Sequence, residues 1–244
     1  MKYPPLPQKD WVYFLDFDGT IVDIADRPEG VRIRQELVHL LAELDQVTEG
    51  ALILVSGRSI SVLDEFLRPL RLRASGLHGS EYRLHRDGEV DRCQLPASAL
   101  DPIRPQLRAF GAKHDRIQLE DKSVSIAIHY RRAPEQKEAV RKLAEKACGV
   151  LGATFTCLAG KMVYEIKPSD VNKGQAIERF MTGQRFYGRR PVFVGDDVTD
   201  EDGFRACNLR GGVSVRVGTP NELTEARFRL TNVDDVEEWL GRVA

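Results

Sequence analysis

Four segments of the chain are continuously apolar and rich in β-branched residues, which is typical of strands buried on both faces. They are Val12 to Leu15, Ala51 to Val55, Val192 to Val194, and Val213 to Val217. Between them, apolar residues recur at the spacing of amphipathic helices, in groups that begin at Leu37, Ile60, Ala176 and Val236. Because strands and helices alternate, the pattern predicts an α/β fold whose core is a doubly wound, Rossmann-like parallel sheet.

The middle third of the chain has a different pattern. Asp87-Gly88 is a hairpin signal between two short candidate strands, Tyr82 to His85 and Glu89 to Cys93. The elements expected after it are an alternating, half-buried strand at Ser123 to Arg131, a helix at Pro134 to Cys148, and two strands at Thr154 to Leu158 and Met162 to Lys167. We therefore predict an α+β cap domain inserted at residues 83–167, within a core domain formed by residues 1–82 and 168–244.

Composition excludes several classes of protein. The chain has 244 residues, enough to bury a sizeable core, and its 36 basic and 37 acidic residues give a net charge of −1. This balance argues against nucleic acid or an anionic membrane as a partner. A small-molecule substrate is the expected partner. The protein could be a monomer, but the sequence does not determine its oligomeric state.

The cysteines and the N-terminal segment bear on the compartment. Cysteines occur at four separated positions, Cys93, Cys148, Cys157 and Cys207. They show neither CxxC spacing nor nearby histidine pairs, so we expect reduced, mostly buried thiols rather than a zinc site or a redox dithiol. The apolar stretch from Trp11 to Leu15 is too short for a signal-peptide core. We expect a cytoplasmic protein.

Polar residues with recognisable chemistry follow the predicted strands. Asp16 and Asp18 follow the first strand, and Ser56 follows the second. The third of the four apolar runs is followed by Gly195-Asp196-Asp197-Val198-Thr199-Asp200-Glu201, where so many carboxylates would repel one another without a cation. The carboxyl ends of parallel strands form the ligand-binding edge of such a sheet. Lys173, at a predicted helix start, adds a positive charge suited to phosphate.

Taken in chain order, Asp16 to Thr20, Ser56, Lys173 and Gly195-Asp196-Asp197 resemble the four motifs of the haloacid dehalogenase superfamily of phosphatases. The resemblance implies that Asp16 attacks phosphorus to form an aspartyl phosphate, and that Asp18 acts as acid to the leaving alkoxide and then as base to water. It also implies a Mg²⁺ held by Asp16, the backbone carbonyl of Asp18 and Asp196. Ser56 and Lys173 would clamp the phosphoryl oxygens.

Five further segments are together similar to the trehalose-6-phosphate phosphatases. They are Gly76 to Glu81, Leu119 to Lys122, His129 to Arg131, Gly160 to Pro168, and Gly195 to Glu201. The resemblance implies that the cap grips the sugar hydroxyls through Glu120, Lys122, His129, Arg131, Lys161 and Glu165. It also implies substrate contacts from Arg58, His78 and Gly79. Two of these have other interpretations, because Arg58 could pair with a core carboxylate and His78 could orient a loop.

The expected function is hydrolysis of trehalose 6-phosphate by a Mg²⁺-dependent phosphatase. Serine-hydrolase and nucleotide-kinase interpretations are excluded because the chain has neither a Gly-x-Ser-x-Gly segment nor a Walker loop. Two alternatives stay open: a phosphatase of another disaccharide or glycosyl-acid phosphate, and a non-catalytic domain that binds sugar phosphate. Retention of Asp16, Asp18, Lys173 and Asp196 argues against the second.

Overall fold

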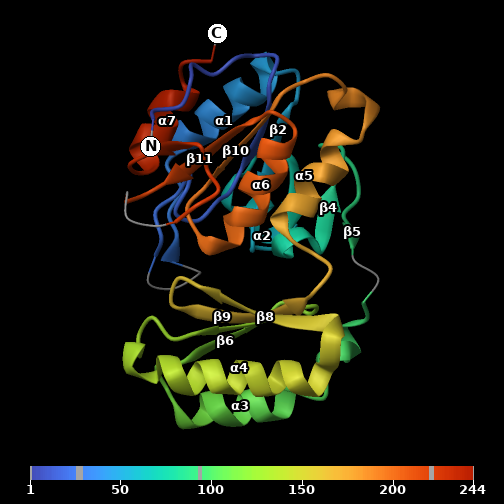
Figure 1. Ribbon diagram of the computed structural model, residues 1–244, viewed down its shortest axis with the longest axis vertical. Helices are drawn as coiled ribbons and strands as arrows, with labels where there is room; N and C mark the ends of the chain where they lie inside the picture. Colours follow the sequence, from blue (N-terminus) through green and yellow to red (C-terminus); the bar gives the residue numbers. More distant parts are fainter. Residues whose placement is uncertain (1, 26–29, 93–94, 220–222, 244) are drawn as a thin grey trace. The chain divides into compact units, whose positions relative to one another are not determined.

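The computed structural model describes residues 2–25, 30–92, 95–219 and 223–243 (Figure 1). The chain divides into two units: Met1–Arg92 with Asn172–Ala244, which we call the core unit, and Cys93–Val171, which we call the inserted unit. This division falls later in the chain than the boundaries we predicted, after residues 82 and 167. At the first boundary the reason is that residues 83–92 complete β4 and β5, which hydrogen-bond within the sheet of the core unit.

The core unit contains an eight-stranded sheet in the order β12-β11-β10-β1-β2-β3-β4-β5. Its strands are β1 (Val12–Leu15), β2 (Leu52–Val55), β3 (Arg73–Gly76), β4 (Glu81–Arg83), β5 (Asp91–Arg92), β10 (Pro191–Gly195), β11 (Val213–Val217) and β12 (Phe228–Leu230). All neighbours from β12 to β3 are parallel, whereas β4 and β5 pair antiparallel at one edge. The carboxyl ends of β1, β2 and β10 therefore share one edge of the sheet.

Helices cover both faces of this sheet (Figure 1). They are α1 (Gln35–Val47), α2 (Ile60–Phe66), α5 (Lys173–Met181), α6 (Glu201–Leu209) and α7 (Val233–Leu240). Tyr13 and Leu15 of β1 pack in one cluster with α1 and α7, while Phe14 packs in a second with Phe180 of α5 and Phe204 of α6. Alternate residues of one strand thus bury against opposite helical layers, which explains the continuously apolar sequence.

The inserted unit is a four-stranded antiparallel sheet with two helices on one face (Figure 1). Its elements are α3 (Arg104–Lys113), β6 (Gln118–Asp121), β7 (Ile126–His129), α4 (Lys137–Leu151), β8 (Phe155–Gly160) and β9 (Val163–Pro168), and the strand order is β6-β7-β9-β8. Ile128 and Ile166 pack with Val140 and Ala144 of α4. Single-turn 3-10 helices occur at Leu77–Gly79, Ala97–Leu100, Pro134–Gln136, Gly152–Thr154, Gln184–Phe186 and Val198–Asp200.

The predicted α/β architecture is confirmed, and several details differ. The strand predicted from residue 123 to 131 is shorter, because Ser123 has a left-handed φ of +72° and only Ile126–His129 pair as β7. The two hairpin strands form but join the core sheet, and Cys93 lies outside the described residues. Within the described residues, no helix is both long enough and apolar enough to span a membrane.

Candidate active site

A buried carboxylate lies at the carboxyl end of β1. Asp16 directly follows the strand, is 4% exposed, and its backbone N–H donates to the Val194 carbonyl of β10 at 2.9 Å. Its Oδ2 accepts a hydrogen bond from the Thr20 hydroxyl at 3.0 Å. Strand pairing and this hydroxyl together fix the carboxylate at the ligand-binding edge of the sheet.

Gly19 brings a second strand end close to the first. Its φ of +80° lies in the left-handed region that glycine tolerates best. A Cβ at this position would lie 2.2 Å from Oδ2 of Asp196, which follows β10. The missing side chain therefore creates the space in which Asp196 approaches the loop after β1.

Lys173 is the buried cation of the site. It is the first residue of α5, it is 3% exposed, and its Nζ lies 2.7 Å from Oδ1 of Asp16 and 2.6 Å from Oδ1 of Asp200. Burial on its own would lower the pKa of Lys173, but the two carboxylates raise it above its ordinary value. Lys173 is therefore held as a charged ammonium group next to the carboxylate that we predict to be the nucleophile.

Asp200 organises the loop after β10. It is fully buried, and its Oδ2 accepts hydrogen bonds from the backbone N–H groups of Asp196 and Asp197, each at 2.9 Å. Its Oδ1 accepts a hydrogen bond from Lys173, so the Asp200 side chain links the loop after β10 to the start of α5. Asp200 belongs to the carboxylate cluster predicted from the sequence, but no role in the site was predicted for it. Its position four residues after Asp196, in a turn that caps the following helix, could have indicated that its side chain binds the backbone of this loop.

Three carboxylates meet at this edge of the sheet. One oxygen from each of Asp16, Asp196 and Asp200 lies within 4.8 Å of the others. Burial, with a contribution from neighbouring carboxylates, raises the pKa of Asp16 to about 7 and that of Asp196 to about 8, while Lys173 opposes both shifts. An oxygen-rich cluster whose negative charge is destabilised in this way fits a hard divalent cation. These residues could hold a metal ion.

Asp18 and Arg58 form an ion pair at the same edge. Arg58 Nε donates to one Asp18 oxygen and its terminal nitrogen to the other, both at 2.7 Å. The guanidinium also lies 5.1 Å from the centre of the Phe66 ring. The backbone N–H of Arg58 donates to the hydroxyl of Ser56, which is buried after β2. The alternative in which Arg58 pairs with a core carboxylate therefore matches the structure.

His78 and Gly79 lie in a turn after β3 that contacts the loop after β2. The His78 N–H donates to the Ser56 carbonyl at 3.0 Å, and the Leu77 N–H donates to the Arg58 carbonyl at 2.9 Å. His78 is 8% exposed. The interpretation in which His78 orients a loop agrees with these contacts.

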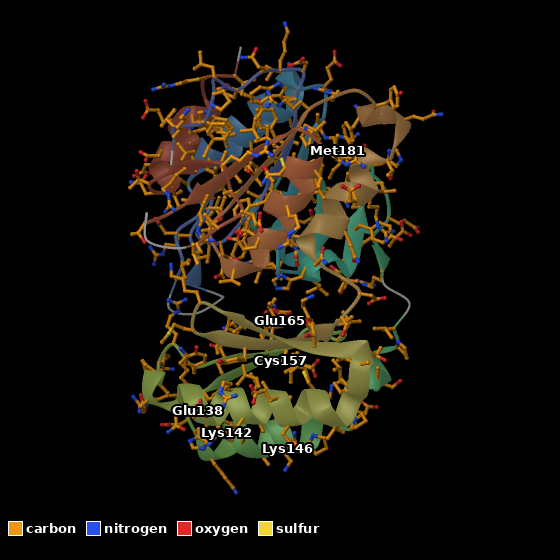
Figure 2. The ribbon with its side chains drawn as sticks, viewed as in Figure 1. Glu138, Lys142, Lys146, Cys157, Glu165 and Met181 are labelled. Atoms are coloured by element: carbon orange, nitrogen blue, oxygen red, sulfur yellow. The ribbon has the colours of Figure 1, made fainter. Side chains whose placement is uncertain are left out.

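The inserted unit gathers a second polar group on the face of its sheet opposite to α4. In Figure 2, Glu165 points away from α4, whereas Cys157 lies between the sheet and that helix. Glu165 Oε1 accepts from the Ser125 hydroxyl at 2.8 Å and lies 3.4 Å from Lys122 Nζ. Ser125 was absent from the site residues we predicted, although it lies within the alternating segment predicted at Ser123 to Arg131, directly before β7.

Other predicted residues of the inserted unit extend this group. His129 Nε2 and Glu120 Oε2 are 3.0 Å apart, and Glu120 lies 3.9 Å from Lys122. Arg131 donates to the backbone carbonyl of Lys161. Lys161 lies in the β8–β9 turn rather than on the strand that carries Glu165.

The described cysteines are free thiols. Cys207 is buried, as predicted, whereas Cys148 and Cys157 are only half-buried. Burial raises the pKa of the Cys207 thiol to about 12, which keeps it protonated and unreactive near neutral pH.

Comparison with known proteins identifies relatives along most of the chain. The family model described as trehalose-phosphatase matches residues 14–234. A trehalose-6-phosphate phosphatase of Escherichia coli K12 is 39% identical over 237 residues, which cover 97% of this chain and 87% of that protein. The match therefore includes both the core unit and the inserted unit.

Solved structures show the same fold. The C-terminal domain of a Candida albicans trehalose-6-phosphate phosphatase superposes with a TM-score of 0.85 at 21% identity, covering 98% of this chain and 97% of that one. A haloacid dehalogenase-like hydrolase from Bacteroides thetaiotaomicron superposes with a TM-score of 0.66 at 15% identity, covering 95% and 98%. At these identities the likeness concerns the fold alone, and it agrees with the predicted α/β fold.

Proposed function

Because the chain belongs to the trehalose-phosphatase family, we propose that it is a Mg²⁺-dependent phosphatase that hydrolyses trehalose 6-phosphate to trehalose and phosphate. The observation that carries the proposal is the meeting of Asp16, Lys173 and Asp196 from three separate elements at one sheet edge. A nucleophile, a cation and a metal-binding carboxylate are the groups that phosphoryl transfer requires.

In the proposed mechanism, the Asp16 carboxylate attacks phosphorus while the bond from phosphorus to the sugar oxygen breaks. Asp18 gives a proton to the departing alkoxide, a poor leaving group that needs an acid. Water then attacks the aspartyl phosphate, Asp18 takes its proton, and phosphate leaves with Asp16 restored. Arg58 donates to both Asp18 oxygens in this structure, so one of these bonds must open and Asp18 must take up a proton from solvent before it can act as an acid.

The remaining core residues act on charge and position. Lys173 and Ser56 would bind the phosphoryl oxygens, and the two carboxylates beside Lys173 keep it charged for this purpose. Mg²⁺ bound by Asp16, the Asp18 carbonyl and Asp196 would supply positive charge against the phosphoryl group. Asp200 is buried against Lys173 and the loop after β10, and we assign it the role of holding the two in position.

We assign substrate choice to the polar face of the inserted unit. The residues proposed to contact the sugar are Glu120, Lys122, His129, Arg131, Lys161 and Glu165. Near the phosphoryl group we propose Arg58, with His78 and Gly79 in the turn beside the loop of Ser56. Support comes from the hydrogen-bonded cluster of Glu165, Ser125 and Lys122, because charged groups held in place suit recognition of hydroxyls. We also propose that the enzyme is cytoplasmic, and the free thiols agree with a reducing compartment.

Phosphate release from a panel of sugar phosphates, with and without Mg²⁺, tests this function. We expect fast, Mg²⁺-dependent release from trehalose 6-phosphate and slow release from glucose 6-phosphate. Preference for another disaccharide or glycosyl-acid phosphate would support the first alternative. Binding of sugar phosphate with no release from any member of the panel would support the non-catalytic one.

A further inference from the structure

The turn after β3 has an unusual backbone. Leu77, His78 and Gly79 have successive φ values of +49°, +55° and +111°, all in the left-handed half of conformational space. Leu77 and His78 are not glycines, and both are buried. Residues other than glycine rarely adopt this backbone conformation, and they keep it only where the surrounding structure enforces it. The contacts of the turn therefore show what this conformation achieves.

One side of the turn lies against the loop after β2. A Cβ on Gly57 would lie only 2.5 Å from Nε2 and 2.7 Å from Cε1 of His78, so the imidazole occupies the space directly above the Gly57 α-carbon. The two backbone hydrogen bonds from Leu77 and His78 reach the residues on either side of Gly57. The turn thus holds the segment of Ser56, which we propose to bind phosphate.

The other side of the turn lies against the start of α5. A Cβ on Gly79 would lie 2.9 Å from the Asn172 carbonyl oxygen and 3.4 Å from its backbone nitrogen. Asn172 is the N-cap of α5, and its side chain accepts a hydrogen bond from the Gln175 N–H. The next residue is Lys173, so a glycine in the turn allows close contact with the backbone that carries the buried cation.

We propose that the Leu77–Gly79 turn is a spacer between the two groups that clamp phosphate, the loop of Ser56 and the helix start of Lys173. His78 is a positioning residue in this account: its ring sets the position of Gly57 and thereby of Ser56. Because the backbone is left-handed here, the adjacent residues His78 and Gly79 contact different elements: His78 contacts the loop after β2, and Gly79 contacts the start of α5. The inference rests on the proposed function for the identity of the phosphoryl substrate, but its contacts lie wholly within the core unit.

The test uses a pair of substitutions that exchange volume across the contact. Gly57→Ala adds the methyl group that would collide with the imidazole, and His78→Asn removes the ring while keeping a residue that tolerates a left-handed backbone. The double variant carries both changes. The matched controls are Gly149→Ala, where nothing lies within 4 Å of the added carbon, and His85→Asn on the exposed surface.

The measurement is the affinity for inorganic phosphate by isothermal titration calorimetry with Mg²⁺, alongside Tm. We expect each single variant to bind phosphate roughly tenfold more weakly or worse, because a misplacement of about 1 Å can cost about 100-fold in a positioned site. The phosphate affinity of the double variant should fall by a smaller factor than the two single factors multiplied together, because the added methyl group fills part of the space that the ring leaves. Both controls should bind as the unaltered protein does.

Three results would overturn the inference: single variants with unaltered phosphate affinity, single losses that multiply in the double variant, or an unaltered protein that does not bind phosphate. A purely structural role of His78 would lower Tm and leave the affinity of the folded protein unchanged. If Gly57→Ala does not fold, the double variant decides: tighter phosphate binding than in His78→Asn supports positioning, and equal or weaker binding contradicts it. Hydrolysis of trehalose 6-phosphate is measured separately, so a failure of the proposed function would be seen without affecting this result.

Discussion

The two polar clusters of the molecule differ in how they are held. In the core unit, Asp16, Lys173 and Asp200 are almost completely buried and bind one another, and Asp200 also accepts from two backbone N–H groups. In the inserted unit, Glu165 and Ser125 are buried too, but the side chains of Glu120 and His129 are 36% and 26% exposed, and Glu165 binds to other side chains. Buried groups at strand ends suit a fixed reaction, whereas partly exposed groups on a sheet face suit adaptation to a particular substrate.

This contrast predicts which substitutions harm every substrate and which harm one. Changes in the buried cluster should lower hydrolysis of any phosphate ester, because all share the phosphoryl group. Changes in the inserted unit should act on trehalose 6-phosphate and spare a small aryl phosphate.

The largest effect is expected from Asp16→Asn. The side chain is nearly isosteric but cannot form the aspartyl phosphate, so turnover should fall by several powers of ten for both substrates. Initial rates of phosphate release measure the loss, and a thermal melt serves as the folding control. Near-normal release by the folded variant would remove Asp16 from the role of nucleophile.

Removal of metal should have the next largest effect. Excess EDTA should abolish hydrolysis and Mg²⁺ restore it, whereas Ca²⁺ should not, because it is larger and prefers a higher coordination number. Mg²⁺ should also raise Tm by offsetting repulsion among the buried carboxylates, and this rise should vanish in Asp196→Ala. Undiminished activity in excess chelator would contradict the metal assignment.

Asp200→Asn tests the position of Lys173. The amide oxygen can still accept from the two backbone N–H groups, but the charge beside Lys173 is lost, which costs about 1.5–3 kcal/mol for a charged hydrogen bond. We expect kcat to fall roughly tenfold to 100-fold for both substrates. The neighbouring Asp197→Asn is the control and should change kcat little. Equal effects of the two variants would argue against a specific role for Asp200.

The smallest effect is expected from His129→Gln. Its pair with Glu120 is partly exposed to solvent, so its loss should change the free energy of unfolding by less than about 1 kcal/mol. We expect a fall of a few-fold in kcat/KM for trehalose 6-phosphate and none for an aryl phosphate. Steady-state kinetics with both substrates measure this, and an equal fall for both would place His129 outside substrate recognition.

The fold was predictable where one physical effect dominates. Strands β1 and β11 match their predicted residues because burial on both faces requires continuous apolar sequence. Strand β3, with the sequence Arg-Ala-Ser-Gly, was not predicted because it has no such run. It is a strand because β2 and β4 pair with it on either side, and Arg73 is satisfied there by the Gly50 and Leu84 carbonyls.

The candidate site, like the fold, was predictable where one physical effect dominates and not where separate elements pack together. Asp16, Ser56 and Asp196 could be predicted because the carboxyl ends of parallel strands share an edge. The contacts of Asp200 with Lys173 and of Ser125 with Glu165 depend on how separate elements pack, which spacing along one chain does not encode. Membership of the predicted family is confirmed by the comparisons, whereas the individual site roles stay predictions.

The division of labour between the two units is tested most directly by one ratio. It is kcat/KM for trehalose 6-phosphate divided by kcat/KM for an aryl phosphate, measured in the unaltered protein, in Ser56→Ala and in Glu165→Ala. We predict that Ser56→Ala lowers both constants and leaves the ratio nearly unchanged. Glu165→Ala should lower the ratio about tenfold or more, because only the disaccharide uses a charged contact worth about 1.5–3 kcal/mol. An unchanged ratio in Glu165→Ala, with both constants reduced equally, would contradict the account.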